Sequence, residues 1–61
     1  MVTYVAVLNY STNCVYMYEF EGDKEYDEIE DFLYIEKDFS PDEIYIMCSN
    51  SKIDVVYENC D

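Results

Sequence analysis

The sequence contains no histidine, no arginine and no tryptophan, and it has one glycine and one proline in 61 residues. Without histidine, the chain lacks the usual general base near neutral pH. Three lysines stand against fifteen Asp and Glu residues, so the formal net charge is −12. A direct nucleic-acid binder needs the opposite sign of charge, and an anionic membrane surface would repel this chain. The composition therefore argues against direct binding to nucleic acid or membrane.

Cysteine is too sparse for a disulfide scaffold. Cys14, Cys48 and Cys60 are an odd number and are widely spaced, unlike the dense, even set of a small secreted domain. They form no closely spaced pair, and the acidic stretch 21–30 lacks the residue order of a calcium-binding loop, so we expect no metal site and no cofactor. Cys14 and Cys48 are expected to be buried as small hydrophobic residues. No signal-peptide pattern is present, so we expect a cytoplasmic protein with reduced thiols.

Catalytic residues are not expected. A nucleophilic cysteine needs a neighbouring base or positive charge, and none of the three cysteines has one in the sequence. Fifteen acids supply many chance carboxylate pairs, so such pairs carry no specificity. A chain this short also has little room for a concave pocket. The sequence favours a non-enzymatic protein.

What the chain does have is enough apolar surface to fold. Hydrophobic residues make up 51% of it, with eight tyrosines and three phenylalanines, so we expect one domain over residues 1–61. The expected strands are Val2–Asn9, Cys14–Phe20, Glu43–Ser49 and Ile53–Glu58. A helix is expected over residues 24–37, and one helical or tight turn at residues 40–43. This predicts an α+β domain of order ββαββ, with a four-stranded antiparallel sheet of order 2-1-3-4 and one helix packed on one face.

The expected helix is amphipathic. At 100° per residue, one stripe carries four apolar side chains, at Tyr26, Ile29, Phe32 and Leu33. The opposite side carries acids, which we assign as a candidate partner-binding face: Asp23, Asp27, Glu28, Glu30 and Asp31. Asp23 can also cap the helix.

The expected sheet has a second unusual feature, because its first hairpin is apolar on both faces. One face, beneath the helix, is expected to hold Val5, Val7, Val15, Met17, Ile44, Ile46 and Val55. The other would then carry four tyrosines, at Tyr4, Tyr16, Tyr18 and Tyr45. Shifting the register of one strand changes these names but leaves an aromatic face either way. Tyrosine tolerates water and is enriched in interfaces, so either solvent or a second copy or partner covers this face.

The acidic segment has a charge density close to that of DNA. Residues 23–31 place six acids within about 12 Å of helix rise, where duplex DNA carries about seven charges. In composition the chain resembles the small acidic DNA-mimic inhibitors of phages and mobile elements, which engage basic nucleic-acid-binding proteins. The resemblance implies a basic protein partner. The alternatives are that the charge serves solubility alone, or that the chain is a structural or assembly module acting as a homodimer through the tyrosine face.

Overall fold

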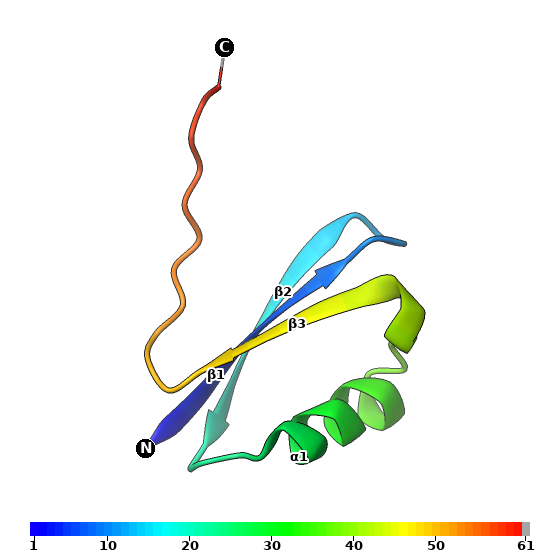
Figure 1. Cartoon of the computed structure of the whole chain (residues 1–61), viewed down its shortest axis with the longest axis vertical. Helices are drawn as coiled ribbons and strands as arrows, with labels where there is room; N and C mark the ends of the chain where they lie inside the picture. Colours follow the sequence, from blue (N-terminus) through cyan, green and yellow to red (C-terminus); the bar gives the residue numbers. More distant parts are fainter. Residues whose placement is uncertain (61) are drawn as a thin grey trace.

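The computed structural model describes residues 1–60 and shows a three-stranded antiparallel sheet with a helical segment on one side (Figure 1). In chain order the elements are β1 (Val2–Asn9), β2 (Cys14–Glu21), α1 (Tyr26–Asp31), the π-helical turn η1 (Phe32–Glu36), the 3₁₀ turn η2 (Pro41–Glu43) and β3 (Ile44–Ser49). The strand order is β2-β1-β3. The predicted α+β class is confirmed, but the predicted fourth strand is not formed within the described residues.

The turn between β1 and β2 sets the register of the whole hairpin. Asn9 pairs with Cys14, so residues 10–13 form the loop. The side-chain Oδ1 of Asn9 accepts the backbone N–H groups of Ser11 at 2.8 Å and Thr12 at 3.0 Å. Asn13 then adopts a positive φ of 60°, which Asn tolerates better than most residues. Because the loop has an even number of residues, odd positions of β1 lie opposite even positions of β2.

This register overturns the expected assignment of faces on β2. Val5 pairs with Tyr18 and Val7 with Tyr16, and paired residues share a face of the sheet. Tyr16 and Tyr18 therefore lie beneath the helical segment, and the intervening residues Val15 and Met17 lie on the far face. The prediction that four tyrosines share the far face is wrong for Tyr16 and Tyr18, because it placed odd-numbered residues of both strands on one face, whereas the four-residue loop pairs odd with even.

The faces of β3 agree with the sequence expectation. Val7 pairs with Ile46 and Asn9 with Ile44, so both isoleucines face the helical segment. Tyr45 and Met47 point to the far face, as the alternation of a strand requires.

The helical segment is shorter at both ends than the predicted range 24–37. Glu25 occupies the N-cap position without a side-chain hydrogen bond, so the expected cap at Asp23 is not made. After α1 the chain widens into η1, where the Lys37 N–H donates to the Phe32 carbonyl at 3.1 Å. Asp38 follows with a positive φ of 60°, and the chain leaves the helical segment there.

The core lies between the sheet and the helical segment and is small. Its buried side chains come from β1, the helical segment and the start of β3: Val5, Val7, Ile29, Leu33 and Ile44. Aromatic rings widen it, as Tyr18 and Phe20 both pack edge-on against Phe32, with centroids 5.7 and 5.0 Å apart. Such pairs add about 0.5–1.5 kcal/mol each beyond the area they bury, and they account for the half-buried tyrosines on β2.

Thr3 ties the end of β2 to the start of the helical segment. It is 3% exposed, its hydroxyl donates to the Gly22 carbonyl at 2.8 Å, and the same oxygen accepts the Lys24 N–H at 3.0 Å. Gly22 has a φ of 81°, a conformation in which a residue with a side chain is strained. These contacts fix where the acidic segment begins.

Residues 50–60 follow β3 without regular structure as an extended segment (Figure 1), and residues 52–55 line a hollow together with residues of β1 and β2. We call residues 50–60 the C-terminal segment. Val55, which was expected beneath the helix, is 52% exposed here.

Candidate functional site

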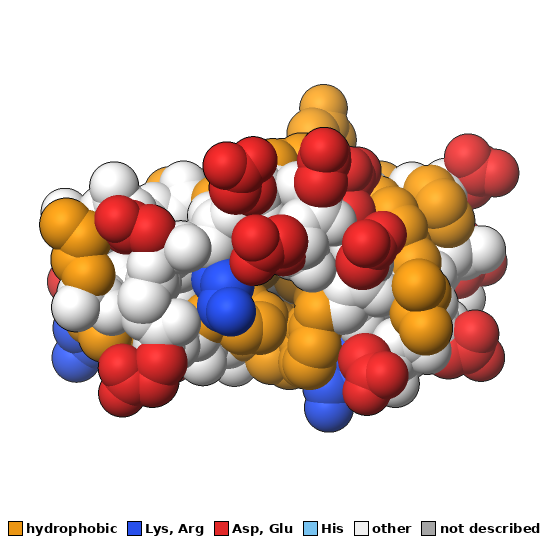
Figure 2. Space-filling model, turned by 90° about the horizontal axis from the view of Figure 1, so that it is seen from below, with side chains coloured by type: hydrophobic (Ala, Val, Ile, Leu, Met, Phe, Trp, Pro, Cys, Tyr) orange, Lys and Arg blue, Asp and Glu red, His pale blue; other side chains and the backbone are white. Residues whose placement is uncertain are grey.

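The acidic side chains of the helical segment form the first candidate surface, which we call the acidic face: Asp23, Asp27, Glu28, Glu30 and Asp31. Four of the five are exposed, and Glu30 is half-buried. Ile29 and Leu33 of the same segment are buried on the sheet, so the carboxylates between them are held toward solvent. Figure 2 shows acidic side chains spread over the side of the molecule on which α1 lies, with lysines and apolar patches between them.

Few cations neutralise this charge. Within residues 1–60, the one ion pair joins Lys24 Nζ to Glu28 Oε2 at 3.8 Å. Lys37 lies instead over two aromatic rings, 5.8 Å from the centroid of Tyr18 and 5.7 Å from that of Phe32. Lys52 belongs to the C-terminal segment. An exposed ion pair at this spacing contributes only about 0.3–0.5 kcal/mol, so the acidic face keeps most of its negative potential.

Glu30 is the half-buried member of the acidic face, and its carboxylate accepts a side-chain hydrogen bond. The Tyr34 hydroxyl donates to Glu30 Oε2 at 3.3 Å, one turn further along the chain. Burial first, and then the Glu30 carboxylate, raise the pKa of Tyr34 above its usual value. Burial and Glu30 also raise the pKa of Tyr26. Glu30 is thus partly structural, and the outward charge is carried by Asp23, Asp27, Glu28 and Asp31.

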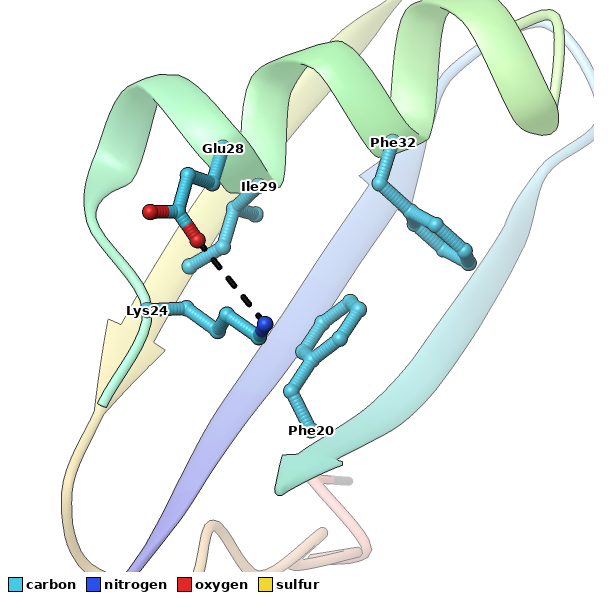
Figure 3. Close-up of a pocket in the computed structure, with 5 residues that line it drawn as sticks. All are labelled: Phe20, Lys24, Glu28, Ile29 and Phe32. Carbon is cyan, nitrogen blue, oxygen red and sulfur yellow. Dashed lines mark ion pairs between the residues drawn. The ribbon is translucent and has the colours of Figure 1, made fainter. Parts of the chain in front are cut away.

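A shallow hollow of about 300 Å³ opens beside the acidic face, between the end of β2 and α1 (Figure 3). Phe20, Ile29 and Phe32 line its floor, and Lys24 and Glu28 close one side with their ion pair. The lining offers one ammonium and one carboxylate, each already facing the other. The hollow can therefore receive an apolar side chain of a docking partner next to a matched pair of charges.

The far face of the sheet is the second candidate surface. It carries exposed aliphatic and sulfur-containing side chains together with one exposed tyrosine, and we call this set the far-face patch: Leu8, Val15, Met17, Tyr45 and Met47. Tyr4 lies on the same face and is half-buried. The predicted apolar far face is therefore present, with Tyr4 and Tyr45 on it as expected, but Val15 and Met17 occupy the places expected for Tyr16 and Tyr18. The alternation of residues in β1 and β3 predicted this apolar face, and the one feature that the sequence did not define was the register of β2.

The cysteines lie outside both surfaces. All three are free and exposed, so the expectation that Cys14 and Cys48 are buried is wrong. Cys14 closes the β1–β2 turn and Cys48 lies near the end of β3, where the C-terminal segment does not cover it. Partial burial raises the pKa of the Cys48 thiol.

In residues 1–60 of the chain, no cluster of three or more Cys, Asp or Glu side chains is arranged to hold a metal ion. None of the helices in this part of the chain is both long and apolar enough to cross a membrane.

Comparisons with known proteins found no matching family model, no matching curated protein and no matching solved structure.

Proposed function

We propose that this chain is a non-enzymatic cytoplasmic binding protein whose acidic face engages a basic surface on another protein. The observation that carries the proposal is the placement of the acids on a helical segment anchored by buried side chains. Asp27, Glu28 and Asp31 extend from the same short segment whose Ile29 and Leu33 are buried in the core. The charge is therefore presented at fixed positions, and a fixed array can be matched by a partner.

The class of partner follows from the sign and density of the charge. A net charge of −12 on 61 residues steers positively charged surfaces toward the chain and raises the rate of encounter. Proteins that bind nucleic acid carry such surfaces, because they neutralise phosphates with Lys and Arg. We therefore propose a DNA-mimic type of inhibitor that occupies the nucleic-acid groove of its partner.

The experiment is a pull-down with the tagged chain from a nuclease-treated lysate of its source or host, washed in steps of rising salt. The test variant replaces Asp23, Asp27, Glu28 and Asp31 by Asn or Gln. The control variant makes the same number of replacements away from the helical segment, at Glu19, Glu21, Asp42 and Glu43, all of which are exposed. Both variants lose four negative charges, so they differ only in where the charge is lost.

The proposal predicts capture of a basic nucleic-acid-binding protein that is released as salt rises. Capture should fall at least tenfold in the test variant and much less in the control variant. An equal loss in both variants would mean that net charge alone matters. A partner that stays bound in high salt, or one indifferent to both variants, contradicts the proposal.

A second function is favoured by the far-face patch, whose exposed apolar side chains include Leu8, Met17 and Met47. Apolar patches of this kind often mark interaction sites. In this alternative the chain is an assembly module that forms a homodimer through the far face. Met47→Lys should then convert a dimer to a monomer in light scattering coupled to gel filtration. A dimer that survives this substitution rules the far face out.

A further inference from the structure

The C-terminal segment has the composition of a strand but pairs with none. Three of its apolar side chains are open to solvent, with Val55 52%, Val56 74% and Tyr57 93% exposed, and Ile53 is half-buried. Residues 53–58 alternate Ile53, Val55 and Tyr57 with Asp54, Val56 and Glu58, the pattern of a strand with one buried face. Near its start the segment lies beside Tyr4 and Met17 at the edge of a shallow hollow. Beyond that hollow it leaves the sheet (Figure 1).

The sheet of the same molecule has an open edge that suits such a segment. In the order β2-β1-β3, one side of β3 pairs with β1 and the other is free within residues 1–60. The Tyr10 N–H bonds to the Glu43 carbonyl at 2.8 Å, which places the β1-facing groups of β3 on odd-numbered residues. Ile44, Ile46 and Cys48 therefore direct their backbone N–H and C=O groups to the open edge. No charged side chain occurs between Ile44 and Ser49, so nothing repels an added strand.

The short connection between β3 and the C-terminal segment hinders their pairing within one chain. Folding back onto its own β3 would require a tight turn at residues 49–52, where the favoured hairpin turns call for glycine. The chain's one glycine is Gly22. In the structure Asn50 and Ser51 form bends, and the Ser51 N–H bonds to the Ser49 Oγ at 3.0 Å. This local hydrogen bond directs the segment away from the open edge, and a short connection that does not make a tight turn favours exchange between copies.

We propose that the C-terminal segment of one copy adds to the β3 edge of a second copy as a fourth, antiparallel strand, and that the exchange is mutual. The alternation fits this placement, because Ile53, Val55 and Tyr57 would extend the row of Ile44 and Ile46 beneath the helical segment. The polar alternates Asp54 and Glu58 would lie on the far face. A hydrogen-bonded edge without charge is the contact between copies that a chain of charge −12 tolerates best.

A second copy is the chosen occupant because each chain supplies both halves of the contact. A closed exchange of this type is symmetric, leaves no half unpaired and stops at two copies. The acidic face lies on the opposite side of the helical segment from the core, so it remains accessible in the dimer. The proposal does not depend on the function of the acidic face.

The test compares two neighbouring valines that lie on opposite faces of the added strand. Val55→Lys places a charge on the side that the exchange buries, and Val56→Lys places the same charge on the side that it leaves exposed. Both residues are more than half exposed in the single chain, so neither change should unfold it, and circular dichroism checks this. Mass is measured by light scattering coupled to gel filtration, with the chain loaded at millimolar concentration.

The proposal predicts a dimer for the unmodified chain and for Val56→Lys, and a monomer for Val55→Lys. A Met47→Lys variant should remain a dimer, which separates strand exchange from association through the far-face patch. A monomeric unmodified chain overturns the proposal. So does a dimer that tolerates Val55→Lys, or one that both valine variants abolish to the same extent.

Discussion

Leu33 and Ile35 are close neighbours in η1 with opposite surroundings, since Leu33 is fully buried and Ile35 is 73% exposed. Replacing Leu33 by Ala leaves a cavity in a core of few side chains, so the free energy of unfolding should fall by about 2–5 kcal/mol. Ile35→Ala should change it by less than about 0.5 kcal/mol. Urea unfolding of both variants makes the comparison, and equal effects would contradict the described packing of η1.

The raised pKa of Tyr34 predicts a loss of stability at high pH. Burial and the Glu30 carboxylate raise its pKa in the folded chain, and burial likewise raises the pKa of Tyr18 and Tyr26. Above the usual tyrosine pKa of about 10 the unfolded chain releases these protons first, so its free energy falls relative to the folded chain. The stabilisation is complete below that pH and is lost as the pH rises through the folded pKa.

The matching variant is Tyr34→Phe, which keeps the ring and removes the hydroxyl. Its free energy of unfolding should decline less steeply than that of the unmodified chain between pH 9 and about pH 11. Urea titrations at several pH values give the slope. Tyr57→Phe, at a residue 93% exposed, is the control and should follow the unmodified chain. Identical slopes for all three proteins would contradict the raised pKa of Tyr34.

At the scale of single elements, the sequence predicts what local pattern determines. The bounds of the first strand, the start of the second, and the 3₁₀ turn before β3 follow from alternation and from Ser40-Pro41, and the structure confirms them. The faces of β2 do not follow from the strand bounds alone, because they depend on which residues pair across the turn. The pairing of Asn9 with Cys14 sets that register, and the alternation of Val15 and Tyr16 fits either face.

The residue that follows the helical segment and its last turn, Asp38, has a strained backbone conformation, which can be tested. Asp38 adopts a φ of 60°, a conformation that costs an L-residue roughly 1–2 kcal/mol, and its negative charge lies at the unfavourable end of the helix dipole. Asp38→Gly should therefore raise the free energy of unfolding by about 0.5–1 kcal/mol. Asp38→Asn removes the charge but keeps a side chain, so it should gain less. Urea unfolding measures both, and a loss of stability in Asp38→Gly would contradict the conformation.

At the scale of the whole molecule, the sequence predicts the acidic face but not the course of the C-terminal segment. Amphipathic spacing places Ile29 and Leu33 inward, so acids on the opposite side of the segment, such as Asp27 and Asp31, face solvent. Residues 53–58 have an equally clear strand pattern and yet form no strand in the single chain. An alternating pattern indicates that a segment has one apolar face. Pairing with the neighbouring strand also requires a turn that the intervening residues can make.

The net charge of the molecule predicts how its stability responds to salt. Repulsion among acids opposes the compact state at low ionic strength, and salt screens exposed charges beyond about 10 Å at 0.1 M. The melting temperature should therefore rise between about 0.01 M and 0.5 M sodium chloride. The variant lacking Asp23, Asp27, Glu28 and Asp31 should melt higher at low salt and gain less from added salt. A melting temperature that falls with salt would contradict net repulsion.

Competition with duplex DNA for the captured partner tests the proposed mimicry most directly. The partner is bound to labelled duplex DNA, and the chain is added in a titration followed by fluorescence anisotropy, in parallel with its four-substitution variant. We predict that the chain displaces the DNA completely, that displacement weakens as salt rises, and that the variant needs at least tenfold more protein. A ternary complex in which DNA stays bound would contradict the claim that the acidic face occupies the nucleic-acid groove.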